Sequence, residues 1–427
     1  MKFLVVGGGG REHAIIKKLS ESEKVSKIYA APGNGGIADL AECVAIKATD
    51  LEAMVEFAVN NAIDFCVVAP DDPLVLGMVD AMNEKGIPCF GPSKAAAIIE
   101  GSKAFSKDLM KKYNIPTAEY EIFDDPAKAM AYIEGRNEFP VVVKADGLAL
   151  GKGVLICADL EEARAGVNEI MVDQKFGASG NQIVVEEFLT GPEVSVLSFT
   201  DGKVVVPMVS SMDHKRALDG DMGLNTGGMG TLAPNPYYTD AIAAECMEKI
   251  FLPTVNAMNA ENRTFKGCLY FGLMLTPKGP KVIEYNCRFG DPETQVVLPL
   301  LKGDLAEIFI AVAEGKLADM KVEFENGAAA CVIMASGGYP SSYKSGYVMT
   351  GIDEANNLPD TYVYHAGSKL TEEGIVTAGG RVLGVTAKAD DLQTALQKAY
   401  KAVDVIHFEG AHYRRDIGRR ALLAGKE

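Results

Sequence analysis

The segment 281–289, KVIEYNCRF, alternates polar and apolar residues in a pattern that could hold a metal ion. Side chains alternate across a β-strand, so Glu284, Asn286 and Arg288 are expected on one face, with successive members about 7 Å apart. A carboxylate and an amide oxygen suit Mg²⁺ or Mn²⁺, and a guanidinium can hold a phosphate or a developing oxyanion. The opposite face is expected to pack on a core and contains Ile283, Tyr285, Cys287 and Phe289.

The turn that follows this strand, 290–295, adds two acids, Asp291 and Glu293, beside the same edge. A solvated polar face is the alternative interpretation of the strand. The two extra acids count against it, because they concentrate charge where a site would need it.

A second candidate site is the glycine-rich segment 146–153, DGLALGKG, which follows Lys144 at the end of an apolar run. It does not fit a P-loop, because its glycines are one residue too close and Gly153 stands where Ser or Thr would hold magnesium. The segment also connects two expected strands, 141–144 and 154–157. A flexible hairpin loop that closes over a triphosphate fits this placement, and a solvated hairpin with incidental lysines is the alternative.

The N-terminal glycines 7–10 come where an apolar strand passes into a helix. Backbone N–H groups at such a helix start can hold a phosphate, and a purely structural turn is the alternative. A nicotinamide cofactor is disfavoured, because the third glycine of its fingerprint falls on Glu12 or His13 and the second strand ends, at 29–34, without a carboxylate.

A third polar cluster joins residues 211–216, SMDHKR, to the amide-rich loop 225–230, NTGGMG. Cations beside a glycine loop suit recognition of a phosphate or carboxylate, and surface charge on a mobile loop is the alternative. We expect His214 by itself to be structural.

The elements that must position these residues fall into several units. Strands at 3–6, 27–30, 65–69 and 88–90 alternate with helices at 12–19, 51–60 and 74–85, which indicates a doubly wound parallel sheet. Small α+β units follow, with a helix at 103–113, a strand at 182–188 and further strands at 203–209 and 268–275. The last hundred residues read as a separate α+β domain that ends in a basic tail, 414–420. We therefore expect four domains: 1–102, 103–190, 191–327 and 328–427.

Composition restricts the function. The chain has 427 residues and a net charge of −16, from 42 Lys and Arg against 58 Asp and Glu. Such an acidic chain would repel a nucleic-acid backbone. The closest two of the eight cysteines, Cys268 and Cys287, are 19 positions apart, so no zinc or redox pair is expected. With no signal peptide and no apolar run near 18 residues, the sequence predicts a cytoplasmic protein without a membrane partner.

Taken in their order along the chain, these clusters closely resemble the motifs of the phosphoribosylamine–glycine ligase family (glycinamide ribonucleotide synthetases) of ATP-grasp enzymes. The resemblance covers essentially the whole chain, and its most specific motif is NCRFGDPETQ at 286–295. Further matching motifs lie at 8–14, 31–34, 100–105, 144–148, 213–216, 225–230, 336–340 and 365–367. The implied fold is an N-terminal doubly wound domain, an ATP-grasp core of two α+β units and a C-terminal α+β domain.

The resemblance implies an ATP-dependent ligase of purine biosynthesis. It would join glycine to 5-phosphoribosylamine through a glycyl phosphate, giving glycinamide ribonucleotide, ADP and phosphate. Such phosphoryl transfer relies on positioning and charge neutralisation rather than on a nucleophilic side chain. We expect a monomer that needs Mg²⁺ or Mn²⁺ and acts on small molecules, without a nucleic-acid partner.

Residue roles carry over by motif. Glu284 and Asn286 match the metal ligands, and Arg288 would stabilise the acyl phosphate. The remaining catalytic candidates are Asp213, Lys215 and Asp291. The ATP candidates are Lys103, Lys144, Gly151, Lys152, Gly153, Glu186, Glu187, Phe188, Leu189 and Glu193. The substrate candidates are Gly10, Arg11, Asn34, Thr226, Gly227, Gly228, Met229 and Gly230.

Two departures from the family pattern bear on substrate affinity: Asp71 replaces the usual Glu after Pro70, and Leu224 replaces the usual Pro before Asn225. Three other interpretations remain open. One is another ATP-grasp carboxylate–amine ligase or a carboxylase; the others are a nicotinamide oxidoreductase and a nucleotide sensor without catalysis.

Overall fold

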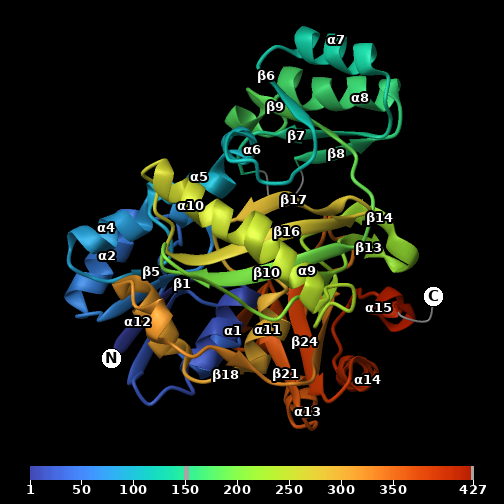
Figure 1. The fold of residues 1–427 in the computed structure, drawn as a ribbon. Coiled ribbons are helices and arrows are strands. Elements are labelled where there is room, and N and C mark those ends of the chain that lie inside the picture. The colour runs from blue at the N-terminus through green and yellow to red at the C-terminus, as the bar shows by residue number, and fades with distance from the viewer. Residues whose placement is uncertain (149–152, 425–427) are drawn as a thin grey trace.

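The computed structural model describes residues 1–148 and 153–424 (Figure 1). The candidate ATP residues Gly151 and Lys152 lie outside this described part. None of the helices described has the length and apolar character that crossing a bilayer requires.

The N-terminal region forms the expected doubly wound sheet, all parallel, in the order β3-β2-β1-β4-β5. The expected helix 74–85 is wrong as one element, because Gly77, with φ of 103°, divides it into two. The strands are β1 (Lys2–Gly7), β2 (Lys27–Pro32), β3 (Glu42–Cys43), β4 (Phe65–Val68) and β5 (Cys89–Phe90). The helices are α1 (Gly10–Leu19), α2 (Leu51–Asn60), α3 (Asp71–Leu76), α4 (Met78–Glu84) and α5 (Lys94–Gly101).

Helix α6 (Lys103–Lys112) leads into a small unit that stands apart at the top of Figure 1. Its antiparallel sheet has the order β6-β9-β7-β8 and its own apolar core. The elements are β6 (Tyr120–Phe123), α7 (Pro126–Arg136), β7 (Val141–Ala145), β8 (Val154–Cys157), α8 (Leu160–Val167), a π-helical turn (Asn168–Val172) and β9 (Ile183–Glu187).

The central region contains a second antiparallel sheet, in the order β11-β10-β16-β17. Its strands are β10 (Glu193–Thr200), β11 (Val205–Pro207), β16 (Gly267–Thr276) and β17 (Gly279–Asn286); β18 (Leu301–Lys302) pairs separately with β19 (Glu323–Phe324). The helices of this region are α9 (Asp240–Cys246), α10 (Leu252–Ala260), α11 (Thr294–Val297) and α12 (Leu305–Glu314).

Strand β17 differs from the expected strand in two ways. It ends at Asn286, so Arg288 lies beyond it, and a bulge interrupts the alternation, because Gly272 pairs with Glu284 whereas Leu273 pairs with Val282. The extra residue, Ile283, is only half-buried, and Val282 packs in the core instead. The expected core position of Ile283 was therefore wrong, because a bulge shifts the residues before it to the other face.

The C-terminal region shares a sheet with the central region. Strand β12 pairs with β15, and β15 pairs with β20, in the order β12-β15-β20-β24-β21, so the boundary expected at residue 327 divides one sheet. The strands are β12 (Met212–Asp213), β15 (Gly230–Ala233), β20 (Ala328–Ala335), β21 (Thr361–His365) and β24 (Arg381–Ala389). Two hairpins, β13 (Arg216–Leu218) with β14 (Met222–Asn225) and β22 (Ser368–Thr371) with β23 (Gly374–Thr377), accompany helices α13 (Ile352–Asn356), α14 (Leu392–Val403) and α15 (Arg419–Leu423).

Apolar packing holds the N-terminal sheet against the central region. Two of the apolar cores contain residues from both regions. In one of them, Phe90 of β5 stacks on Phe309 of α12 with ring centroids 3.9 Å apart, and Phe289 lies against both. Since Phe289 follows β17 directly, this packing fixes the N-terminal glycine loop relative to the end of the candidate metal strand.

Candidate active site

Glu284 and Asn286 share one face at the end of β17, where cations surround them. Lys215 Nζ lies 3.8 Å from Glu284 Oε1. Burial alone would raise the pKa of Glu284, but Lys215, Lys144 and Lys103 hold this pKa below its ordinary value. The carboxylate is therefore ionised and able to hold a cation.

The two protein oxygen donors at this position, from Glu284 and Asn286, fit a divalent ion whose other ligands come mainly from a bound substrate. Residues 1–148 and 153–424 contain no cluster of three or more His, Cys, Asp or Glu side chains suited to a metal. An ion held by Glu284 and the Asn286 amide oxygen would keep most of its positions for phosphate oxygens and water, as Mg²⁺ commonly does.

Two lysines from different elements, Lys107 of α6 and Lys144 of β7, converge on buried Glu186. Lys144 Nζ lies 3.0 Å from Glu186 Oε1, and Lys107 Nζ lies 3.1 Å from Oε2. Burial, together with the charge of Lys144, lowers the pKa of Lys107 to about 8. Sequence reasoning missed Lys107, although it lies one helical turn after Lys103.

The remaining ATP candidates line the junction between the small unit and β17. Lys144 Nζ donates to the Ile283 carbonyl at 3.1 Å, and Lys103 Nζ donates to the Gly147 carbonyl at 2.7 Å. Glu187 accepts from Lys281 Nζ at 2.7 Å. The carboxylates of both Glu186 and Glu187 already have cationic partners. The backbone of residues 186–189, which includes exposed Phe188 and its neighbour Leu189, therefore remains available to bind the base of ATP.

Glu193 begins β10 on the opposite side of the metal candidates. Its carboxylate lies 3.3 Å from Lys215 Nζ, so Lys215 stands between Glu193 and Glu284. The structure thus brings together candidates that are widely separated in the chain.

Arg288 lies beyond β17, and its Nη2 lies close to three acceptors. Its Nη2 donates to Glu100 Oε1 at 2.8 Å and to Asn286 Oδ1 at 3.3 Å, and it lies 3.9 Å from Asp71 Oδ2. Buried Nε has no partner among the described residues, so it is free to bind a ligand oxygen. Arg288 and Arg11 keep the pKa of Asp71 below its ordinary value although burial opposes this. No role was assigned to Glu100 from the sequence, although it belongs to the motif 100–105.

The turn 290–295 meets the N-terminal glycine loop. Asp291 Oδ2 accepts from the Arg11 backbone N–H at 3.3 Å, and Gln295 Nε2 donates to Asp291 Oδ1 at 2.9 Å. The Gly9 N–H donates to Glu12 Oε2 at 2.6 Å. A side chain at Gly10 would come within 2.5 Å of Gln295 Nε2. Carboxylates therefore occupy two amides of the expected phosphate cradle, and the same acids disfavour a dinucleotide pyrophosphate there.

The side chain of Asn34 has a full set of protein partners. Its Nδ2 donates to the carbonyls of Gly8 and His365, and its Oδ1 accepts from the backbone N–H groups of Gly36 and Ile37. Asn34 thus ties the N-terminal loop to the C-terminal region, and a direct substrate contact by it stays a prediction.

The backbone amides of the glycine-rich loop 225–230 already bond to protein groups. The N–H groups of residues 226–229 donate to the Lys215 carbonyl, Tyr339 OH, Thr226 Oγ1 and the His214 carbonyl, in that order. A β-carbon at Gly228, where φ is 112°, would come 2.6 Å from Asp213 Oδ1. The loop is therefore shaped tightly around Asp213, and recognition of a carboxylate by Thr226, Gly227, Met229 or Gly230 stays a prediction.

Sequence reasoning missed Arg381, which reaches the site from β24. Its Nη1 donates to the carbonyls of Gly227 and Asp291 at 2.6 and 2.8 Å, and its Nη2 lies 3.4 Å from Asp291 Oδ1. This arginine joins the glycine loop to the turn 290–295. No motif around Arg381 suggested this, because the contact depends on the shared sheet.

An acid pair, half-buried Asp213 and buried Glu293, faces this loop. Glu293 Oε1 accepts from Tyr270 OH at 3.2 Å and from Ser195 Oγ at 3.4 Å. Burial raises the pKa of both acids, and for Asp213 the nearby Glu293 charge raises it further. Such a pair can hold a proton close to the substrate side of the site.

Together, two α+β units with lysines on both sides of a metal-type carboxylate define an enzyme of the ATP-grasp class. Three family models cover most of the chain. Residues 1–100, 101–294 and 329–420 match the N, ATP-grasp (A) and C domains of phosphoribosylglycinamide synthetase. The chain belongs to the phosphoribosylglycinamide synthetase family.

Similar proteins carry a consistent name. A phosphoribosylamine–glycine ligase from Caldanaerobacter subterraneus is 50% identical over 417 residues, covering 98% of this chain and 99% of the relative. One from Escherichia coli O6:H1 is 47% identical, covering 99% of each. The crystal structure of phosphoribosylamine–glycine ligase from Thermotoga maritima has a TM-score of 0.82 at 32% identity, covering 97% of this chain and 100% of that one.

More distant structures share the fold alone. The biotin carboxylase domain of 2-oxoglutarate carboxylase from Hydrogenobacter thermophilus has a TM-score of 0.74 at 18% identity, covering 96% of this chain and 91% of that chain. The expected fold class is confirmed.

Proposed function

We propose that this protein joins glycine to 5-phosphoribosylamine at the expense of ATP, giving glycinamide ribonucleotide, ADP and phosphate in purine biosynthesis. The observation that carries the proposal is the placement of ionised Glu284 among Lys103, Lys144 and Lys215. A site of this kind can bind a metal–triphosphate on one side and a small carboxylate on the other.

The first step is transfer of the γ-phosphoryl group. A glycine carboxylate oxygen attacks the γ-phosphorus, the bond to the β-phosphate oxygen breaks, and ADP and glycyl phosphate form. Lys103 and Lys144 neutralise the phosphate oxygens, and Arg288 uses its free Nε to hold the acyl phosphate.

The second step forms the amide. The amine of 5-phosphoribosylamine attacks the glycyl carbonyl carbon, and the carbon–oxygen bond to the phosphate breaks. The attacking nitrogen must release a proton, and the Asp213 carboxylate, with its raised pKa, is suited to accept it. Lys215 and Arg381 hold the surrounding segments in place.

A divalent cation belongs to this site. Glu284 and Asn286 would hold Mg²⁺ or Mn²⁺, which would supply charge neutralisation on the ATP phosphates. The oxygen donors suit both ions.

We also propose that the protein acts in the cytoplasm as a monomer on three small molecules, without nucleic acid. The net charge of −16 supports the absence of a nucleic-acid partner, because it opposes contact with a phosphate backbone.

The experiment that tests the function measures ADP release with ATP, Mg²⁺, glycine and freshly generated 5-phosphoribosylamine, omitting one component at a time. We expect release that requires glycine and the amine, with an amide product by mass spectrometry. ADP release with a different acid would reject glycine as the substrate. ATP binding without any ADP release would reject catalysis and favour a nucleotide sensor.

A further inference from the structure

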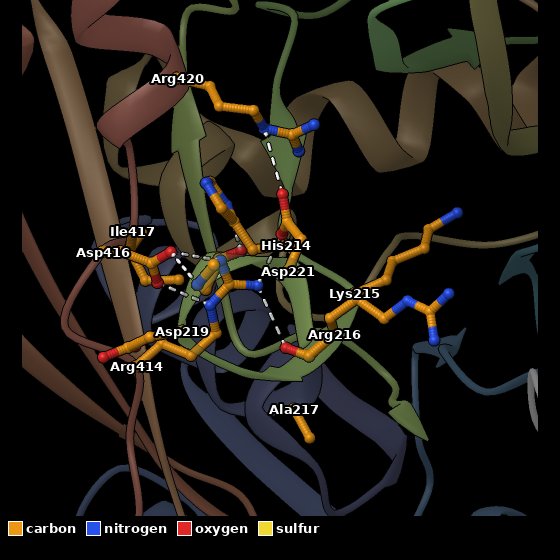
Figure 2. Close-up of polar contacts among 12 residues, drawn as sticks. His214, Lys215, Arg216, Ala217, Asp219, Asp221, Arg414, Asp416, Ile417 and Arg420 are labelled. Atoms are coloured by element: carbon orange, nitrogen blue, oxygen red, sulfur yellow. Dashed lines mark hydrogen bonds and ion pairs between the residues drawn. The ribbon is translucent and has the colours of Figure 1, made fainter. Parts of the chain in front are cut away.

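The segment that carries Asp213 and Lys215 has a second side that faces the C-terminal end of the chain. Asp213 lies against the glycine loop at Gly228, and Lys215 lies close to Glu193 and Glu284. His214 and the β13–β14 hairpin instead contact residues 412–418 (Figure 2). The proposed function uses the first side only. We call the contacting residues, His412, Arg414, Asp416 and Gly418, the C-terminal clamp.

Arg414 is the central residue of the clamp and is only 1% exposed. Its Nε and Nη2 form a two-pronged pair with Asp416 at 2.8 and 2.9 Å. Its Nη1 donates to Asp221 Oδ1 at 2.9 Å and to the Arg216 carbonyl at 3.1 Å. A guanidinium can make these bonds at once because its donors lie in a fixed planar fork.

His214 provides the second connection. Its Nδ1 lies 3.2 Å from the Gly230 carbonyl, and its Nε2 lies 3.1 Å from the Gly418 N–H. A carbonyl can only accept and an N–H can only donate, so the ring is neutral with its proton on Nδ1. His214 therefore connects the end of the glycine loop to the clamp.

Further bonds tie the hairpin to the same segment. His412 Nε2 lies 2.7 Å from the Ala217 carbonyl, and the Gly220 N–H donates to Asp416 Oδ2 at 2.8 Å. A cavity of about 210 Å³ lies beside these contacts. The Arg414 donors and the acids that line this cavity are bonded to one another, which favours a structural connection over a ligand site.

We propose that Arg414 and His214 are positioning residues, which hold the backbone of residues 213–216 so that Asp213 and Lys215 stay aligned with the reacting carboxylate and amine. This inference rests on the proposed function. The clamp contacts the substrate side of the site, whereas Lys103 and Lys144 come from other elements. Disturbing the clamp should therefore affect glycine use and turnover more strongly than the KM for ATP, to which the clamp connects, among the described residues, only through the contacts of Lys215 with Glu193 and Glu284.

Arg414→Lys is the first test, with Arg415→Ala as its matched control. Lysine keeps the charge but cannot reach Asp416, Asp221 and the Arg216 carbonyl together. The Arg415 side chain lies over the Tyr413 ring, and only its backbone N–H bonds to the hairpin, at Asp219. In Arg414→Lys we expect kcat/KM for glycine to fall by about 10- to 100-fold, with the KM for ATP within about twofold. Arg415→Ala should match the unchanged protein.

A second pair of variants tests the connection through His214. Glutamine can place an acceptor near the Nε2 position and keep the bond from Gly418, whereas asparagine reaches only the Nδ1 position. We expect His214→Gln to retain several-fold more kcat/KM for glycine than His214→Asn. If His214 only stabilised the fold, His214→Gln and His214→Asn would have the same kcat/KM for glycine whenever their unfolding midpoints are equal.

If Arg414→Lys does not fold at the assay temperature, Asp221→Asn replaces it, because Asp221 is partly exposed and its loss leaves the Asp416 pair intact. Asp221→Asn is then expected to lower kcat/KM for glycine while the KM for ATP stays within about twofold. Equal losses for glycine and ATP, or unchanged kinetics in folded variants, would overturn the proposal. An unchanged protein without glycine-dependent ADP release would instead show that the proposed function has failed.

Discussion

Single charges decide which chemistry this site can perform. Glu284 is half-exposed and stays ionised because lysines surround it, and Arg288 keeps one buried donor, Nε, without a partner among the described residues. An unpaired buried donor is costly, and at Arg288, beside Asn286, an oxygen of a bound ligand would satisfy it. The site is therefore prepared for negative charge that the substrates bring.

Glu284→Gln should abolish most of the activity. Glutamine keeps the shape but loses the charge that attracts a divalent cation, so we expect kcat to fall by at least about 100-fold and the Mg²⁺ requirement to shift to higher concentration. ADP release measured against Mg²⁺ concentration checks this. Partly exposed Glu245, paired with Lys249, provides the control Glu245→Gln. An unchanged Mg²⁺ dependence in Glu284→Gln would reject the metal assignment.

Arg381→Lys should weaken the substrate side of the site. Lysine cannot bond the carbonyls of Gly227 and Asp291 together, so the glycine loop loses its connection to the turn 290–295. We expect about a tenfold loss in kcat/KM for glycine, with ATP binding retained. Steady-state kinetics at saturating ATP measure this, with Arg164→Lys in helix α8 as the control. A loss confined to the KM for ATP would contradict it.

At the scale of elements, strand ends and loops carry the site, and regular elements hold them. Local patterns predicted the parallel sheet, the hairpin β7–β8 and the strand that carries Glu284. They could not predict the bulge at Ile283 or the contacts of Arg381, Glu100 and Lys107. Those depend on pairing between segments far apart in the chain, which no local pattern encodes.

The glycine loop should tolerate no side chain at Gly228. A β-carbon there would come within 2.6 Å of both Asp213 Oδ1 and Pro292 Cδ. Gly346→Ala is the matched control, because Gly346 also has positive φ, 94°, but open space around it. We expect backbone strain of about 1 kcal/mol in the control and a larger loss of stability with loss of activity in Gly228→Ala. Unfolding curves and ADP release distinguish the two. Equal losses in both variants would show that the loop has room.

Helix α1 and strand β21 meet at two buried histidines. Burial, with the charges of His365 and Lys17, lowers the pKa of His13 to about 3, and burial lowers that of His365 to about 4. In the unfolded chain, both imidazole side chains have an ordinary pKa of about 6.5. Unfolding therefore takes up protons between pH 6.5 and these lower values, and stability falls as pH falls through this window.

His365→Asn should reduce this dependence. We expect a smaller loss of unfolding free energy between pH 7 and pH 5 than in the unchanged protein, measured by urea unfolding. Exposed His407→Asn is the control. An equal slope in His365→Asn would mean that His365 does not contribute to the acid sensitivity.

At the scale of the whole molecule, four of the apolar cores among the described residues hold a continuous body and one holds the small unit. A chain of residues 1–327 should not fold cooperatively, because it lacks β20, which pairs with both β15 and β24. It would also expose the apolar core that Ala329, Cys331 and Ile333 complete in the full chain. We expect aggregation or a broad thermal transition by circular dichroism. A sharp transition with ATP binding would show that the shared sheet is dispensable.

The sheet that crosses residue 327 also limits how such a protein can change over evolutionary time. Strands β12 and β15 lie far before the C-terminal region in the chain but beside it in space. A recombination event that exchanged only the last hundred residues would place foreign strands against native β15 and disturb Asp213. A productive exchange would have to carry residues 212–233 as well, so the substrate loop and the C-terminal region are expected to be inherited together.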